Sequence, residues 1–167
     1  MEELHAPARR NFPRRRVAVR GYDDLWQADV VEMRPYARLN KGHNYILTVI
    51  DALSKYAWAV PLKSKSANEI TRALSKITRN SKRCPKNLQT DKGKKFYNTE
   101  MRKFAKEHGV NHYSTYSVMK ASIVERFNRT LKNSMWKYFT LNGTYKWIGE
   151  LPRLVKEYNA RKHRTSV

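Results

Sequence analysis

The chain has 167 residues, 40% of them hydrophobic, a size and composition that suit one domain with a real core. Its 35 Lys and Arg residues face only 14 Asp and Glu residues, giving a formal net charge of +21, so we expect a polyanionic partner. The single cysteine, Cys84, excludes a disulfide framework and a cysteine-based zinc site, and the five scattered histidines share no ligand spacing.

The first stretch, residues 1–21, is interpreted as a basic arm that precedes a folded domain at residues 22–167. Its first twenty residues hold six Arg and two Glu, a charge of +4, so the rest of the chain still carries +17. The arm is expected to be a linker, with phosphate contact or a nuclear-import signal as alternatives. Without a bilayer-spanning run, signal-peptide core or lipidation signal, we expect an intracellular, nuclear protein with no membrane partner.

Three strand-like runs begin the domain. The first runs from Leu25 to Met33, and its alternation puts one set of residues on one face and a second set on the other: Leu25, Gln27, Asp29 and Val31 against Trp26, Ala28 and Val30. Burying the carboxylate of Asp29 is costly without a partner, which is either an arginine or a functional site. The runs 45–50 and 56–61 predict a hairpin, in whose five-residue turn Asp51 is expected to accept local hydrogen bonds.

The next elements alternate between helix and strand. Residues 66–80 have helical spacing behind the possible caps Ser64 and Ser66, and residues 99–107 predict a helix that stops at Gly109. The runs 85–90 and 110–115 predict the fourth and fifth strands, and 116–121 a polar loop. Asp91 then follows the fourth strand, at the carboxyl edge where sites form in open α/β sheets.

The helix that follows the loop shows two sectors at about 100° per residue. One is apolar and is expected to pack on the sheet: Ile123, Val124, Phe127, Leu131, Met135 and Tyr138. The other is polar and is expected to be exposed: Glu125, Asn128, Arg129, Lys132 and Trp136. An ordinary solvated face with a Glu–Arg pair is the alternative interpretation of the polar sector. A closing helix is predicted at residues 147–160.

Three acids stand out among these elements: Asp29, Asp91 and Glu125, the last two with 33 residues between them. A mid-strand position, a strand end and a first helical turn can converge at one sheet edge. Phosphoryl transfer on nucleic acid uses two divalent ions about 3.5–4 Å apart, held by a few carboxylates. The sequence contains no glycine-rich phosphate loop, zinc spacing or nucleophile elbow that would point to another chemistry.

The motifs around these acids resemble those of retroviral-type integrase cores, and most closely the integrases of Maverick or Polinton DNA transposons. The resemblance covers residues 22–165 and rests on Trp26-Gln27-Ala28-Asp29, Val49-Ile50-Asp51-Ala52-Leu53-Ser54-Lys55, Thr90-Asp91-Lys92-Gly93, Ile123-Val124-Glu125-Arg126-Phe127-Asn128-Arg129-Thr130-Leu131-Lys132 and the closing Tyr158-Asn159 with His163-Arg164-Thr165. It implies an α/β, ribonuclease-H-like fold: a five-stranded mixed sheet, three antiparallel strands then two parallel, flanked by helices.

The resemblance also implies catalysis by Asp29, Asp91 and Glu125, which would bind Mg²⁺ or Mn²⁺ as two ions. It implies DNA as partner, both element ends and target, and a homo-oligomer as the active form. The DNA-binding residues are expected to be Lys92, Lys94, Lys95, Lys120, Asn128, Arg129 and Lys132. Lys92 stands where retroviral members usually have Asn, and Lys95 where many have an acid, so both should favour the ionised form of Asp91.

The resemblance stops at one domain. The family's amino-terminal zinc-binding module and carboxyl-terminal DNA-binding module do not occur in these residues, so we expect a fragment or a host-retained remnant. The sequence therefore predicts a metal-dependent polynucleotidyl transferase that trims and joins DNA ends. A catalytically idle transposon-derived DNA-binding protein and a ribonuclease-H-like hydrolase without transfer activity are the alternatives.

Overall fold

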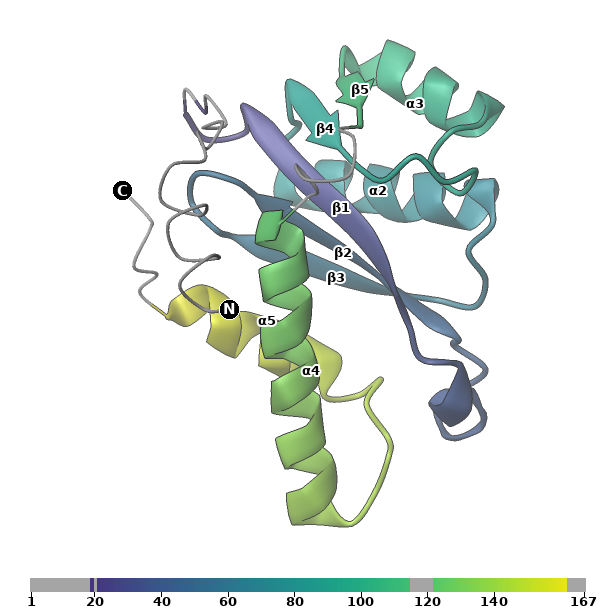
Figure 1. Ribbon diagram of the computed structural model, residues 1–167, viewed down its shortest axis with the longest axis vertical. Helices are drawn as coiled ribbons and strands as arrows, with labels where there is room; N and C mark the ends of the chain where they lie inside the picture. The colour runs from purple at the N-terminus through teal and green to yellow at the C-terminus, as the bar shows by residue number, and fades with distance from the viewer. Residues whose placement is uncertain (1–18, 20, 115–121, 162–167) are drawn as a thin grey trace, which may run out of the picture.

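The computed structural model describes residues 19, 21–114 and 122–161, and a five-stranded sheet with helices on both faces forms its centre (Figure 1). The strands are β1 (Leu25–Glu32), β2 (Tyr45–Asp51), β3 (Ala57–Leu62), β4 (Asn87–Gln89) and β5 (Asn111–Tyr113). Their order is β3-β2-β1-β4-β5. The first three strands pair antiparallel, whereas β4 pairs parallel with β1 and with β5. The predicted mixed sheet is confirmed.

The helices are the 3-10 helix η1 (Arg34–Leu39) and the α-helices α2 (Ala67–Ser81), α3 (Thr99–His108), α4 (Ser122–Asn142) and α5 (Leu151–Ala160). Helix α2 begins after Ser66, whose hydroxyl accepts a hydrogen bond from the Glu69 N–H, as capping predicts. Helix α3 ends at Gly109, which takes the left-handed conformation with φ of 65°. Both boundaries agree with the sequence prediction. None of the described helices is long and apolar enough to cross a membrane.

The two faces of the sheet carry separate apolar cores. Trp26 and Ala28 of β1 pack with α2 and α3 on one face, and Val31 packs with α4 and α5 on the other. Figure 1 shows α4 and α5 on the near side of the sheet and α2 behind it. The predicted alternation of β1 is confirmed. Gln27 and Asp29, which were predicted to share a face with Val31, both form hydrogen bonds to α4.

Two elements differ from the sequence prediction. Helix η1 was not predicted, and the closing helix begins at Leu151 rather than at Trp147. The side-chain oxygen of buried Asn40 accepts hydrogen bonds from the backbone N–H groups of Trp147 (2.7 Å) and Ile148 (3.1 Å). Because these two N–H groups bind Asn40, the segment forms a turn there, and the helix starts four residues later with a proline in its first turn.

Candidate active site

The first predicted acid, Asp29, lies half-buried in β1 under α4. Its Oδ2 accepts a hydrogen bond of 2.9 Å from the amide nitrogen of Asn128 in α4. Burial raises the pKa of Asp29 above its ordinary value, and the charges of Asp91 and Glu125 raise it further, although the Val30 N–H and Lys95 oppose this. Asp29 is therefore close enough to Asp91 and to Glu125 for each of their charges to act on it.

The side chain of Gln27 fixes the start of α4 against the sheet. Its oxygen accepts hydrogen bonds from the backbone N–H groups of Ile123 and Val124, both at 3.0 Å. Its amide nitrogen donates to the side-chain oxygen of Gln89 in β4 at 3.1 Å. One buried side chain thus connects the strand of Asp29, the strand before Asp91 and the helical turn of Glu125. The sequence prediction missed this role, although a polar residue on the buried face of a strand, two positions before an acid, could have indicated it.

The second predicted acid, Asp91, follows the carboxyl end of β4. Its Oδ1 accepts from the backbone N–H of Gly93 at 2.7 Å, and its Oδ2 accepts from the Lys95 ammonium at 2.8 Å. Burial raises the pKa of Asp91, but these two hydrogen bonds and the charge of Lys95 outweigh that effect, so the pKa lies below its ordinary value. The predicted influence of Lys95 on ionisation is confirmed. The influence predicted for Lys92 stays a prediction.

Gly93 allows this close arrangement. A Cβ atom at position 93 would lie 2.9 Å from Asp91 Oδ1 and 3.3 Å from Lys95 Nζ. The first of these distances is shorter than van der Waals contact allows, so any other residue would push the carboxylate or the ammonium away. The glycine of the Thr90-Asp91-Lys92-Gly93 motif therefore lets the Asp91 carboxylate and the Lys95 ammonium lie close to the backbone at this position.

A polar layer supports Asp91 from behind. Thr90 Oγ1 and His112 Nε2 lie 2.7 Å apart, and the His112 ring stacks on Tyr97 with centroids separated by 4.4 Å. The Tyr97 hydroxyl pairs with Ser114 Oγ at 2.5 Å, and Ser114 donates to the Asp91 carbonyl oxygen at 3.2 Å. Burial lowers the pKa of His112 below its ordinary value of 6.5. These contacts fix the backbone of Asp91 while its carboxylate remains half-exposed.

The third predicted acid, Glu125, lies exposed in the first turn of α4. Arg129 and Lys132 follow it on the exposed surface of the same helix. Among the residues that the structure describes, none of these three side chains takes part in an ion pair, so the alternative of a Glu–Arg pair is not seen. This sector of the helix therefore presents one acid and two cations that have no ion-pair partner among the described residues.

Asn128 corrects one part of the sequence prediction. It was expected on the exposed sector of the helix as a DNA-binding residue, but it is buried, with 8% of its surface exposed. It lies three residues after Glu125 and turns toward β1, where its amide nitrogen binds Asp29. Its side-chain oxygen has no hydrogen-bond partner within the described part of the chain. Asn128 therefore orients the Asp29 carboxylate.

The remaining predicted DNA-binding residues fall into three groups. Lys92 and Lys94 are exposed in the loop after Asp91, whereas the side chain of Lys95 is only 23% exposed because it turns back onto Asp91. Arg129 and Lys132 lie on α4. Lys120, the 116–121 loop and the basic arm except residues 19 and 21 lie outside the described residues.

The three acids provide suitable donors for a divalent cation but do not form a metal site as arranged. Within residues 19, 21–114 and 122–161, no three His, Cys, Asp or Glu side chains are grouped so as to hold a metal ion. Carboxylate oxygens are the ligands that Mg²⁺ prefers, and a cation would relieve the repulsion that raises the pKa of Asp29. In the described arrangement, the ammonium of Lys95 supplies the positive charge beside Asp91 instead.

Asp51 is a structural carboxylate, as the sequence predicted. It is fully buried, and its Oδ2 accepts hydrogen bonds from the N–H and the hydroxyl of Ser54 at 2.9 and 2.5 Å. Its Oδ1 accepts from the backbone N–H of Asp23 at 2.9 Å, and Arg83 Nη2 lies 3.7 Å from Oδ2. Both oxygens are therefore occupied, Oδ2 by the turn and Oδ1 by the backbone of Asp23.

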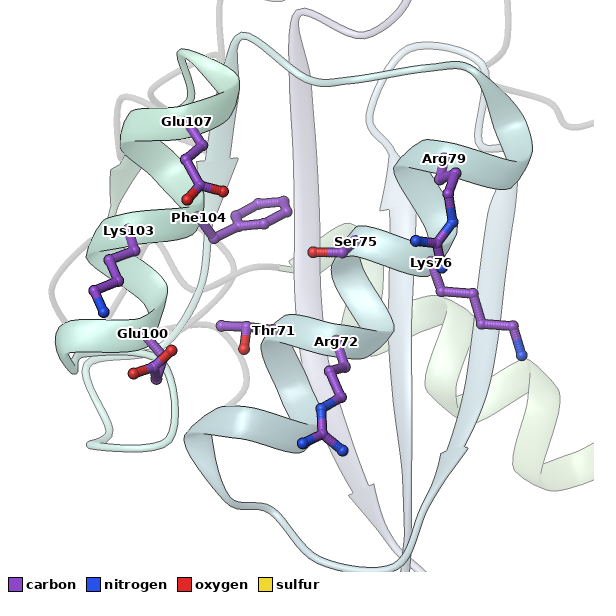
Figure 2. A pocket seen from close by; sticks show the side chains of 9 residues that line it. All are labelled: Thr71, Arg72, Ser75, Lys76, Arg79, Glu100, Lys103, Phe104 and Glu107. Carbon is purple, nitrogen blue, oxygen red and sulfur yellow. The ribbon is translucent and has the colours of Figure 1, made fainter.

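A pocket of about 540 Å³ lies between α2 and α3, the helices that pack on the face of the sheet away from α4 (Figure 2). Figure 2 shows its charged side chains coming from both helices. Four are cations and two are acids: Arg72, Lys76, Arg79, Lys103, Glu100 and Glu107. The acids would repel a phosphate, and the pocket contains none of Asp29, Asp91 and Glu125, so we do not assign it to the candidate site.

Comparison with known proteins decides the family. The model of the family described as "Integrase core domain" matches residues 21–116, more than half of the chain. The chain belongs to the integrase core domain family. A transposon-derived protein of Caenorhabditis elegans is 33% identical to this integrase core over 127 residues, which is 76% of this chain and 44% of that protein. The Pol polyprotein of Radiation murine leukemia virus is 30% identical over 149 residues, 87% of this chain and 25% of the polyprotein.

Solved structures agree on the fold. The structure of a simian T-cell lymphotropic virus intasome in complex with PP2A regulatory subunit B56 gamma matches with a TM-score of 0.74 at 20% identity, covering 87% of this chain and 52% of that one. The HTLV-2 integrase catalytic core domain in complex with magnesium, in a dimeric form, matches with a TM-score of 0.69 at 19% identity, covering 84% and 89%. The fold is the ribonuclease-H-like fold of retroviral-type integrase catalytic cores. The chain spans less than half the length of the two curated relatives.

Proposed function

We propose that this integrase core is a metal-dependent polynucleotidyl transferase that processes and joins DNA ends, with Asp29, Asp91 and Glu125 as its catalytic acids. One observation carries the proposal: Gln27 of β1 forms hydrogen bonds to the first turn of α4 and to Gln89 of β4, and Asn128 of α4 binds Asp29. The elements that carry the three acids are therefore held together at this edge of the sheet. Membership of the integrase core domain family supports the reaction class.

Mg²⁺ or Mn²⁺, as two ions held by the three acids, is the proposed cofactor. When bound, two divalent ions stabilise both the entering and the leaving oxygen of the transferred phosphoryl group. The HTLV-2 core named with magnesium supports this proposal. For Asp91 to bind a cation through Oδ2, Lys95 must give up its hydrogen bond, and the freed ammonium would then be available to a phosphate of the substrate.

DNA contact is assigned to the cations around the acids. Lys92, Lys94 and Lys95 follow Asp91, and Arg129 and Lys132 extend from Glu125 along α4. We propose that they bind backbone phosphates, with Lys120 as a further contact. Asn128 is removed from this set and assigned to the orientation of Asp29. Because the mechanism requires no protein nucleophile, the attacking group would be water or a DNA 3′-hydroxyl.

The assembly, location and lineage are also proposals. We propose a homo-oligomer as the active form, which the dimeric and trimeric forms of the HTLV-2 core and the intasome named among the relatives support. Element ends and a target DNA would be its substrates, and the nucleus its location. Origin in a Maverick or Polinton element stays a prediction from the sequence motifs.

A second candidate, a DNA-binding protein without activity, is favoured by one specific observation. Lys95 forms an ion pair with Asp91, and no three of the described His, Cys, Asp and Glu side chains are grouped to hold a metal. If the ammonium stayed in place, the basic surface would still attract DNA, but Lys95 would compete with a metal ion for Asp91 Oδ2. The two candidates therefore differ in chemistry and not in DNA affinity.

A strand-transfer assay separates the candidates. The purified chain is incubated with short duplex ends and Mn²⁺, beside the Asp91→Asn variant, which keeps the shape of the side chain but removes its charge. We expect joined product from the natural chain and a loss of about a thousandfold or more in the variant, because metal-bound charge contributes several kcal/mol to such transition states. DNA affinity should be largely unchanged.

The possible outcomes point to different functions. Joined product supports the transferase, whereas cutting without joining supports a hydrolase and binding alone supports the idle remnant. An Asp91→Asn variant that remains active would show that the site assignment is wrong. As a control, Lys132→Ala should weaken DNA binding and reduce the slope of log affinity against log salt by about one.

A further inference from the structure

An aromatic cluster lies on α4, about three turns beyond Glu125. The Trp136 ring meets Tyr36 of η1 at a centroid distance of 5.6 Å and Phe139 at 5.2 Å, in both cases edge-on. Tyr145 stacks on the same Tyr36 ring at 5.2 Å. Phe139 is buried, but 44% of the surface of Trp136 is exposed. The cluster therefore holds Trp136 in place while leaving much of it open to solvent.

A small pocket opens beside this tryptophan. It has a volume of about 220 Å³, with walls that include the buried Met33 and Met135 together with Tyr36 and Trp136. Pro35 and the exposed side chains of Glu32 and Lys132 complete its lining. Pockets that hold whole drug-sized ligands usually measure about 300–1,000 Å³. This pocket is smaller, and its apolar and aromatic walls suit a single flat ring system.

Two cations near the pocket lie on the same helix as Trp136, and the one acid that lines it, Glu32 of β1, forms an ion pair with Arg34. Lys132 lies one turn before Trp136, and Arg129 lies between Lys132 and Glu125. Among the described residues neither cation forms an ion pair. Trp136 follows Glu125 by eleven residues, a distance of about 16 Å along the helix axis. A nucleic-acid strand whose phosphates contact Arg129 and Lys132 would therefore bring a base to Trp136.

We propose that Trp136 and its pocket bind an unpaired base of the DNA substrate, by stacking on the indole ring. This inference rests on the proposed function, since it assumes that DNA follows α4 from Glu125. Exposed aromatic rings beside cations bind bases of single-stranded nucleic acid in a sequence-tolerant way, because every base offers a π-face. A base paired inside the duplex could not enter, because both of its faces are covered by neighbouring base pairs.

A second copy of this chain is the competing occupant of the apolar surface. Lys132 lines the pocket, so an interface between copies at this surface would add like charges from a chain whose net charge is already +21, and the proposed homo-oligomer would form through another surface. A strand of DNA brings the opposite charge to the same place. Charge complementarity therefore favours the nucleic acid.

The test measures binding alone, in EDTA, so that no catalytic step is involved. Fluorescence anisotropy compares a blunt duplex with the same duplex carrying a short single-stranded extension, for the natural chain and four variants. We expect the natural chain to prefer the extended duplex and Trp136→Ala to lose that preference, with a change of about tenfold for one stacked base. Trp136→Phe, which keeps an aromatic ring, should retain most of the preference.

Two further variants serve as controls. Leu141, 84% exposed on the same helix, offers a matched apolar truncation, and Leu141→Ala should leave both affinities unchanged. Lys132→Ala should weaken binding of both duplexes alike. Thermal melts of every variant establish that the fold is kept, and Trp136→Phe supplies the comparison if the alanine variant unfolds.

The inference is overturned if the preference for the extension persists in Trp136→Ala, or if the natural chain has no such preference. It is also overturned if Trp136→Ala changes the molecular mass of the particle in solution, since the surface would then join copies of the chain. Each of these results leaves the strand-transfer assay untouched. Loss of joining in that assay, with the preference intact, would instead contradict only the proposed catalysis.

Discussion

Asp51 and Asp91 have the same side chain and lie near the ends of two strands of one sheet, but the two carboxylates have different roles. Each comes at the end of a strand, β2 or β4, with a cation nearby, yet Asp51 is fully buried whereas 50% of the Asp91 side chain is exposed. Asp51 accepts three hydrogen bonds from its own turn and from Asp23. Asp91 accepts one from the backbone and one from a flexible lysine. The buried Asp51 carboxylate, with three hydrogen bonds, has a structural role. The exposed Asp91 carboxylate, with two, is available to bind a cation.

The cations differ in the same way. Arg83 forms an ion pair of 2.8 Å with Asp23, and its guanidinium lies over the rings of Tyr56 and Trp58, 5.5 and 5.0 Å from their centroids. It is therefore held in place independently of Asp51. Lys95 is a single ammonium on a flexible stem, and its ion pair with Asp91 can be exchanged for another charge. The comparison predicts separate consequences for stability and for activity.

Replacing Asp51 or Asp91 by alanine should give the largest difference between an effect on stability and an effect on activity. Asp51→Ala leaves the donors of Ser54 and Asp23 without their acceptor, and we expect it to lower the free energy of unfolding by about 3 kcal/mol or more. Asp91→Ala removes a half-exposed ion pair and should cost less than about 1 kcal/mol. Urea denaturation of both variants measures the difference.

The control is built into the pair, because both changes remove the same atoms. Strand transfer by the folded fraction should survive in Asp51→Ala and vanish in Asp91→Ala. If the two variants lost equal stability, the distinction between structural and available carboxylates would be wrong.

Much of this contrast could be predicted from the sequence, because it depends on local pattern. The alternation in β1 places Asp29 and Gln27 on one face, and a turn predicts that Asp51 accepts local hydrogen bonds. The break in pattern at Gly109 marks the end of α3. Periodicity also identified the apolar side of α4 correctly.

The remaining features depend on contacts between distant parts of the chain. Asn40 binds the N–H of Trp147, 107 residues later, and so turns the chain before α5, and the local sequence does not show this long-range contact. Asn128 was misplaced because helical spacing gives only the angle around the axis. Whether a side chain at that angle faces solvent or a strand depends on how α4 lies across β1. The ion pair of Lys95 likewise depends on a rotamer that the loop allows.

The Lys95 ion pair offers a more moderate test of the comparison. If the ammonium competes with a divalent cation for Asp91, Lys95→Ala should bind Mn²⁺ more tightly. Two charges about 4 Å apart interact by about 1 kcal/mol in water, which corresponds to an affinity change of about fivefold. Isothermal titration with Mn²⁺, without DNA, measures this effect independently of catalysis.

Lys94→Ala is the matched control for this measurement. Lys94 is exposed in the same loop, and its side chain forms no ion pair among the described residues, so its removal subtracts the same formal charge without freeing Asp91. Equal Mn²⁺ affinities in the two variants would show that only the general charge of the loop matters. An affinity gain confined to Lys95→Ala would identify the ion pair as the competitor.

The smallest expected effect concerns pH and the layer behind Asp91. Burial lowers the pKa of His112, so the folded chain takes up a proton on this ring only at a pH below the ordinary value of 6.5. The unfolded chain takes up that proton near pH 6.5. Between the two values the unfolded state binds more protons than the folded state, so the free energy of unfolding rises with pH across this window. The contribution of His112 to stability is therefore lost as the pH falls through the window.

One group can contribute at most about 1.4 kcal/mol per pH unit in that window. His112→Gln, which replaces the ring with a neutral amide, should therefore flatten the fall in stability below pH 6.5, as followed by urea denaturation at a series of pH values. Asp51→Ala changes a turn that, among the described residues, has no hydrogen bond to His112, so it serves as the control and should leave the slope unchanged. If the pH dependence of the free energy of unfolding were the same in His112→Gln, the burial of the His112 ring would not affect stability in this range. The regions around Asp51 and Asp91 would then respond to pH alike.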